Sequence, residues 1–215
     1  MLAAVGIAGL ALAGMQTWGL DSTVASGMSV DAMIQNANTG DLLFFRRNAV
    51  DIAHDLVSGY THVGVTVTAP GHGALLAEMC DAEKNHPAGV HIRDLRSRVA
   101  SYAAEGLVVL VRRTATMDSA AIVREVTALQ RASYPQHLRW YIAACKLLPR
   151  FPWVQRDDSV MVCSEFVLRC LGEPRWRCQT PADVMAWAMH QEAYAPAVKI
   201  VGIPHEAAAG HRACH

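Results

Sequence analysis

The sequence has no surplus of charge of either sign, and few charged residues in total. Its 19 basic side chains balance 19 acidic ones, and charged residues make up 18% of the 215 residues. Proteins that bind nucleic acid through its phosphates need a basic surplus, so we expect no nucleic-acid partner. A hydrophobic content of 52% excludes a disordered chain, and the length suits one domain with elaborations.

Cysteines are too few for a disulfide framework. The 215 residues contain six of them, and no Cys-x2-Cys spacing indicates a structural zinc site. If one cysteine is catalytic, an odd number remains, which suits a reducing compartment better than an oxidising one. The cysteine count therefore argues against secretion.

An uncharged apolar run occurs at the N-terminus, where residues 1–15 are rich in Ala, Gly and Leu. At about 1.5 Å per residue this run is too short to span a hydrocarbon core of ~30 Å. It also lacks the Lys or Arg that opens a signal peptide. Three interpretations remain open: a membrane-inserting or interfacial segment, a signal peptide, and an arm that packs on the protein itself or on a partner.

The rest of the chain predicts strands first and helices later. Runs dense in β-branched, aromatic and aliphatic residues predict strands at residues 42–46, 62–68, 74–79, 90–95 and 107–112. Periodicity, caps and breakers predict helices at residues 30–35, 51–57, 96–104, 118–132, 140–148, 163–171 and 181–193. This order indicates an α+β fold with a mostly antiparallel sheet of about five strands. We divide the chain into an apolar arm and linker (1–38), a domain (39–195) and a C-terminal tail (196–215).

Cys163 stands where a loop gives way to an amphipathic helix, in the segment VCSEFV (162–167). A thiol becomes nucleophilic when it loses its proton, and a helix N-terminus and an imidazole both favour that loss. A buried structural cysteine is the alternative for any cysteine. We assign that structural role to four cysteines that are expected in the middle of elements or in loops, without a basic partner: Cys80, Cys145, Cys170 and Cys178.

His62 and Glu78 are the candidate partners of Cys163. His62 opens a predicted strand in YTHVGV (60–65), where its ring can face a helix terminus, and Gly64 on the same face is expected to leave room for that helix. Glu78 lies among apolar residues of the next strand, where a lone carboxylate needs a partner. Pairing with the second ring nitrogen of His62 would support the imidazolium. The alternatives are a structural histidine and a partly exposed glutamate at a strand end.

Four segments together resemble a known family: GDLLF (40–44), YTHVGV (60–65), Glu78 and VCSEFV (162–167). They are similar to the circularly permuted papain-like hydrolases of the NlpC-type superfamily, which have relatives among lecithin–retinol acyltransferase-like enzymes. The branch found in bacteria, poxviruses and other large DNA viruses is the most similar. The resemblance covers about residues 38–190. It implies a permuted papain-like fold with Cys163 as nucleophile, His62 as base and Glu78 orienting His62.

The resemblance also implies an activity. We expect a cysteine-dependent hydrolase or acyltransferase that forms a thioester from an amide or ester, with a lipid or peptide-like substrate and no metal or organic cofactor. For substrate binding we expect Tyr60 and Ser164, beside the candidate catalytic residues, and Trp140 and Trp153. The two tryptophans belong to an aromatic stretch (135–158) that is a lid, an interaction surface or ordinary helix packing.

Two non-catalytic functions fit the same sequence. One is a structural component of an assembly such as a virion, built on an inherited papain-like fold. The other is a membrane-anchored binding module that uses the Trp-rich stretch. We therefore expect the apolar run at residues 1–15 to contact a membrane or a protein assembly, and the protein to be membrane-associated or part of a larger assembly.

Overall fold

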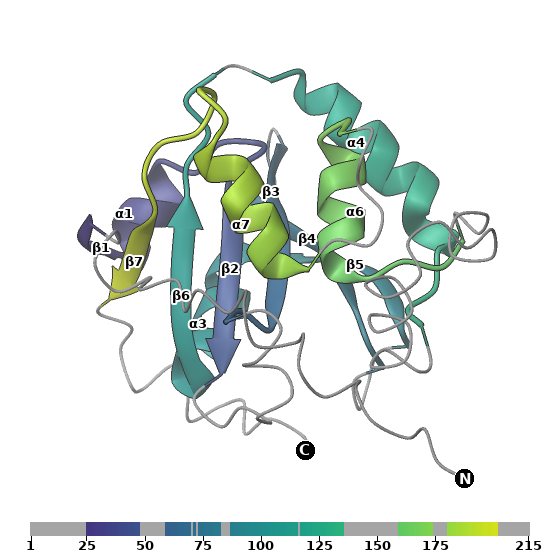
Figure 1. Cartoon of the computed structure of the whole chain (residues 1–215), viewed down its shortest axis with the longest axis horizontal. Coiled ribbons are helices and arrows are strands. Elements are labelled where there is room, and N and C mark those ends of the chain that lie inside the picture. The colour runs from purple at the N-terminus through teal and green to yellow at the C-terminus, as the bar shows by residue number, and fades with distance from the viewer. Residues whose placement is uncertain are drawn as a thin grey trace, which may run out of the picture.

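The fold is known from a computed structural model, which describes residues 25–47, 59–69, 71, 73–82, 87–115, 117–135, 159–173 and 180–201. This part of the chain forms one seven-stranded sheet with α-helices on both faces, an α+β fold (Figure 1). Across the sheet the strands follow in the order β1 (Ala25–Ser29), β7 (Val198–Val201), β6 (Gly106–Val111), β2 (Leu42–Arg47), β3 (His62–Ala69), β4 (Gly73–Cys80) and β5 (Gly89–Asp94). Neighbouring strands are antiparallel except for β1 and β7, which are parallel.

The helices form a layer on each face of the sheet. One layer contains α1 (Val30–Gln35) and α3 (Leu95–Glu105). The other contains α4 (Ser119–Ala128), α6 (Cys163–Cys170) and α7 (Pro181–Met189), with a 3-10 turn (Leu129–Arg131) after α4. In Figure 1, α7 crosses in front of the sheet and α3 lies behind it. None of the helices in the described residues has both the length and the apolar character that a bilayer crossing requires.

Each face of the sheet has its own hydrophobic core, and β2 contributes to both. Leu42 and Phe44 belong to the core that includes α6, whereas Leu43 and Phe45 belong to the core that includes α3. Side chains of a strand alternate between faces, so a strand covered on both sides is apolar at consecutive positions. This explains why β2 begins with four large apolar residues, all with no exposed surface.

The Gly-Asp pair that precedes β2 has a structural role. Gly40 has φ of 93°, and a Cβ there would lie 2.9 Å from the Arg113 side chain. Asp41 is 1% exposed, and its carboxylate accepts hydrogen bonds from the backbone N–H groups of Asn38 at 2.9 Å and Arg113 at 2.7 Å. Burial raises the pKa of Asp41 although these backbone bonds oppose the shift. Gly40 and Asp41 thus connect the start of β2 to the segment that follows β6.

The α+β class is confirmed, but the expected strand number of about five was too low. All five predicted strands are present as β2 to β6, and the two additional strands are β1 and β7. The segment ASGMS of β1 has little β-propensity, and β7 has four residues. Both strands lie in segments that the sequence assigned to the N-terminal linker and the C-terminal tail, and both belong to the sheet.

The helix predictions differ from the structure mainly in their ends. The helix expected at residues 118–132 ends at Ala128 and continues as the 3-10 turn. The last helix ends at Met189, four residues earlier than expected, whereas its start at Thr180 and Pro181 is correct. Thr180 Oγ1 accepts from the Asp183 N–H at 3.3 Å, and Asp183 Oδ2 accepts from the Thr180 N–H at 2.7 Å. The helices expected at 51–57 and 140–148 lie outside the described residues.

Candidate active site

His62 and Glu78 form a buried pair on adjacent strands. His62 is the first residue of β3, Glu78 lies near the end of β4, and the His62 Nε2 and Glu78 Oε2 atoms are 3.0 Å apart. His62 is 9% exposed and Glu78 is fully buried. The predicted contact between these side chains is therefore present, and it uses Nε2 of the ring. Nδ1 is left for another partner.

Cys163 approaches the imidazole ring of His62 from the helix layer that contains α4, α6 and α7. It is the first residue of α6, after Val162 as N-cap, and its side chain is near enough to His62 to raise the pKa of the ring. Cys163 belongs to the α6 core and is 3% exposed. Because His62 stands at the end of its strand, its ring contacts Tyr102 of α3 from one layer and Cys163 of α6 from the other.

The surroundings of His62 favour its protonated form. Burial alone would lower the pKa of His62, since it penalises the charged ring, but Tyr102, Cys163 and Cys80 together hold that pKa well above its ordinary value of 6.5. The Glu78 carboxylate on Nε2 acts in the same direction. The direction of this pKa shift favours the imidazolium form of the ring, which Glu78 contacts on one side.

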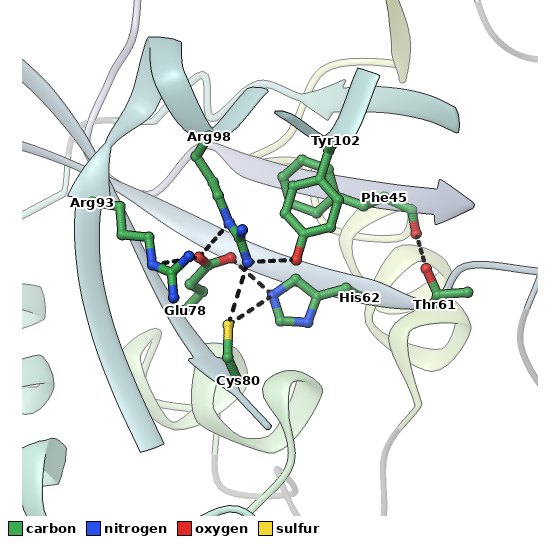
Figure 2. A network of polar contacts seen from close by, with 8 residues as sticks. All are labelled: Phe45, Thr61, His62, Glu78, Cys80, Arg93, Arg98 and Tyr102. Carbon is green, nitrogen blue, oxygen red and sulfur yellow. Dashed lines mark hydrogen bonds and ion pairs between the residues drawn. The ribbon is translucent and has the colours of Figure 1, made fainter. Parts of the chain in front are cut away.

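Glu78 is surrounded by cations. Its Oε1 lies 2.6 Å from Arg98 Nε of α3 and 3.5 Å from Arg93 Nε of β5 (Figure 2). Burial would raise the pKa of Glu78, but the hydrogen bond from His62 and the charges of His62, Arg98 and Arg93 outweigh it, and the pKa lies below its ordinary value of 4.5. Glu78 is therefore ionised throughout the neutral range.

Aromatic side chains cover the ring of His62. The His62 ring stacks near those of Phe45 and Tyr102, with centroid distances of 5.9 Å and 5.7 Å. Tyr134, from the other side of the site, is near enough to interact electrostatically with both Cys163 and His62, and burial raises the pKa of its hydroxyl. Burial raises the pKa of the Tyr102 hydroxyl as well, so both hydroxyls ionise less readily than a free phenol.

Cys80 contradicts our sequence-based interpretation that it has no basic partner. Its Sγ lies 3.9 Å from His62 Nε2 and 3.7 Å from Arg98 Nη2. Cys170, in contrast, is buried in α6 away from His62, and burial raises the pKa of its thiol. The structural interpretation of Cys170 remains, and Cys145 and Cys178 lie outside the described residues.

His62, Glu78 and Cys80 also form a potential metal-ligand set, since their ligand atoms lie within 4.8 Å of one another. Imidazole, carboxylate and thiolate are the ligands that Zn²⁺ prefers. Two fixed cations compete for the same atoms, because Arg98 contacts both Glu78 and Cys80, and Arg93 contacts Glu78. We therefore interpret the cluster as an ion-pair network.

The structure also places the residues predicted to bind substrate. Tyr60 is 3% exposed and packs against Phe44, with ring centroids 5.4 Å apart, and Ser164 is fully buried in α6. Their role in substrate binding stays a prediction. Trp140, Trp153 and residues 1–15 lie outside the described residues.

Gly64 has a different role from the one expected. A Cβ on Gly64 would lie 2.9 Å from Leu76 Cδ1 and 3.2 Å from the Ala77 carbonyl oxygen, both in β4. The absence of a side chain therefore makes room for the neighbouring strand rather than for a helix. Leu76 belongs to the core on the α3 side of the sheet.

Sequence reasoning missed Arg98 and Tyr102, although a signal for both was present. Leu95, Arg98, Val99 and Tyr102 recur at helical spacing on one face of α3, so that a basic residue interrupts an apolar stripe. A charge in such a stripe needs a buried partner of opposite sign. The sequence also offered that partner, because Glu78 places a carboxylate in an otherwise apolar strand.

Comparisons with known proteins provide little further information. No family of known proteins matches the sequence, and no curated protein matches it. Among solved structures, the metalloprotein YiiX (DUF1105) of Escherichia coli O157:H7 aligns at 16% identity with a TM-score of 0.42, over 75% of this chain and 87% of YiiX. A similarity at this level carries no argument about fold or function.

Proposed function

We propose that this protein is a cysteine-dependent hydrolase or acyltransferase that acts on an amide or ester through a thioester. The observation that supports the proposal best is the buried contact between His62 and Glu78 beside Cys163, whose thiol lies in the first turn of a helix and raises the pKa of His62. A helix N-terminus and an imidazolium both stabilise a thiolate. The order of these residues along the chain also suits a permuted papain-like fold, which is part of the proposal.

The proposed mechanism begins with attack of the Cys163 thiolate on the carbonyl carbon, while His62 already holds the proton that the thiol has lost. The backbone N–H of Cys163, at the helix N-terminus, would donate to the oxyanion that forms. His62 then gives its proton to the leaving alcohol or amine, and a thioester remains on Cys163. Water or a second alcohol or amine, deprotonated by His62, releases the acyl group. Glu78 keeps the ring oriented during both steps.

The main alternative is a non-catalytic component of an assembly or membrane. The burial of the site favours it, since Cys163 is 3% exposed and Glu78 has no exposed surface. The charge network favours the enzyme, because buried groups with shifted pKa values, such as His62 and Glu78, gather at functional sites. The proposed contact of residues 1–15 with a lipid surface or a protein assembly is compatible with either function.

We expect acyl transfer to Cys163 from activated substrates. When the protein is mixed with p-nitrophenyl esters of short and long fatty acids and with peptide p-nitroanilides, at least one class should add a single acyl group to Cys163. Peptide mass mapping locates the adduct, and its release by neutral hydroxylamine identifies a thioester. A preference for long acyl chains would indicate a lipid substrate, and one for anilides a peptide-like substrate.

Two variants make this experiment specific. Cys163→Ser should abolish the hydroxylamine-sensitive adduct. Cys170→Ser, which removes another buried thiol of the same helix, should keep it. If no substrate class acylates Cys163, or if the adduct persists in Cys163→Ser, the enzyme proposal is wrong and the assembly component is favoured.

A further inference from the structure

Arg98 lies against the proposed triad, although nothing in the proposed chemistry requires a cation there. It lies in α3 with its side chain 10% exposed, and its Nε is 2.6 Å from Glu78 Oε1. Its Nη2 donates to the Tyr102 hydroxyl at 2.9 Å and lies 3.7 Å from Cys80 Sγ. Figure 2 shows the guanidinium between Glu78, Tyr102 and Cys80.

The two oxygens of Glu78 have separate partners. Oε2 contacts His62, whereas Oε1 contacts Arg98 and Arg93. Rotation of the carboxylate away from His62 would therefore also break the contact with Arg98. Arg93 is the weaker partner, since it is 3.5 Å from Oε1 and its side chain is 19% exposed.

Arg98 is itself held in place by Tyr102. The guanidinium carbon lies 4.3 Å from the centre of the Tyr102 ring, in addition to the hydrogen bond with the hydroxyl. Tyr102 in turn stacks on Phe45 at 3.8 Å between ring centroids. A rigid guanidinium with several donors in a fixed fork is suited to such a position, and a lysine could not make all these contacts at once.

We infer that Arg98 is a positioning residue of the candidate active site, which keeps the carboxylate of Glu78 ionised and directed at His62. This inference rests on the proposed function, although the contacts that it describes concern only the carboxylate of Glu78. The functional unit would then extend over four elements, from Cys163 on α6 through His62 on β3 and Glu78 on β4 to Arg98 on α3.

The effect of removing Arg98 has a definite sign. The titratable and charged groups around Glu78 come from β3, β4, β5 and α3: His62, Cys80, His91, Arg93, Arg98 and Tyr102. Cys163 and Tyr134 adjoin His62 from the other side. Loss of the Arg98 charge makes the carboxylate hold its proton more tightly, and loss of alignment with His62 acts in the same direction. Both consequences raise the pH at which Glu78 titrates.

The test is the titration of Glu78, followed by carbon NMR of protein labelled at its glutamate carboxyls. The signal of Glu78 is the one that disappears in Glu78→Gln. We expect Arg98→Gln to raise the titration midpoint of Glu78 by about one pH unit and to abolish the downfield proton signal of the His62 Nε2–H. Arg98→Lys, which keeps the charge without the fork, should raise the midpoint by about half as much.

Arg96→Gln is the matched control. Arg96 lies on the same helix and pairs with Asp31, but its side chain is 54% exposed. This variant should leave the Glu78 midpoint unchanged. If Arg98→Gln does not fold, the Glu78 midpoint measured in Arg98→Lys tests the inference instead. An unchanged midpoint and an unchanged Nε2–H signal in the folded Arg98 variants would overturn the inference.

The two proposals fail in different ways. The titration of Glu78 can be repeated in Cys163→Ser, so its result does not depend on whether Cys163 is a nucleophile. A protein with acylated Cys163 and an unmoved Glu78 midpoint retains the proposed function and loses the role of Arg98. A shifted Glu78 midpoint with an unreactive Cys163 supports the positioning role of Arg98 and overturns the proposed function.

Discussion

Replacement of His62 by alanine is expected to change the pH dependence of Cys163 alkylation by iodoacetamide. In the wild type the imidazolium stabilises the thiolate, so the rate should fall less than about threefold between about pH 8 and pH 6. Without the imidazole, the alkylation rate of Cys163 should fall by about a hundredfold over the same range, as it does for an ordinary free thiol. The rate is measured by peptide mapping, which separates Cys163 from the other cysteines.

The alkylation rates of wild type and His62→Ala at one pH should differ less than the changes of their rates with pH. At about pH 6 an ordinary thiol is less than about 1% ionised, but a thiolate stabilised by a cation is also intrinsically less nucleophilic. We therefore expect the wild type to react about tenfold faster than His62→Ala at about pH 6. His190→Ala, which removes an exposed histidine at the C-cap of α7, is the control and should match the wild type. Wild-type labelling that follows an ordinary thiol, or that needs denaturation, contradicts an activated Cys163.

Replacement of Glu78 by leucine is expected to destabilise the fold strongly. The variant removes the anion that Arg98, Arg93 and His62 share, and the Arg98 and Arg93 side chains are 10% and 19% exposed. Removing one partner of a buried ion pair typically costs about 3–5 kcal/mol, because the remaining charge is buried without compensation. Urea unfolding at neutral pH measures the change in the free energy of unfolding.

The matched control for Glu78 is Asp31, whose pair with Arg96 lies on the surface. Its side chain is 70% exposed, and that of Arg96 is 54% exposed. Asp31→Leu should therefore change the free energy of unfolding by less than about 1 kcal/mol. Equal effects of Glu78→Leu and Asp31→Leu would contradict a buried network that depends on Glu78.

The destabilisation also has a predicted pH dependence, best seen with Glu78→Gln. The folded-state pKa of Glu78 is lowered, so its stabilisation is complete above the ordinary value of 4.5 and is lost as the pH falls through the folded value. The folded-state pKa of His62 is raised, so its stabilisation is complete below 6.5 and is lost as the pH rises through the folded value. The difference from wild type should therefore be largest between pH 4.5 and 6.5.

Local signals explain most of what could be predicted of the fold. Ser29 and Thr180 mark the starts of α1 and α7 because their side chains accept from backbone N–H groups three residues on. The five strands β2 to β6 were recognisable from dense apolar runs. The sequence offered no comparable signal for β1 and β7, because the two pair with each other across most of the chain length and only β7 contacts the other strands. Such pairing depends on tertiary contacts rather than on local propensity.

The sequence allowed the main residues of the candidate site to be predicted, but not the network of contacts that joins them to α3. The positions of His62 and Glu78 on adjacent strands allowed their contact to be expected, and that contact is present. Cys80 was missed because it is unremarkable within its own element, and Arg98 and Tyr102 were missed although a basic residue interrupts the apolar stripe of α3. Their importance comes from α3 packing over β4, which brings the guanidinium of Arg98 onto Glu78 and Cys80. Strand pairing was readable from the sequence, whereas the position of the helix over the sheet was not.

The measurement that tests the central claim most directly is the thiolate absorbance of Cys163. The ultraviolet spectrum of Cys163→Ser is subtracted from that of the wild type across the pH range. We predict that one thiolate per chain is already present at about pH 6, because the raised pKa of His62 favours an imidazolium beside Cys163. A difference signal that develops only as the pH rises through about 8.5, the ordinary thiol value, would contradict the thiolate–imidazolium pair and with it the proposed chemistry.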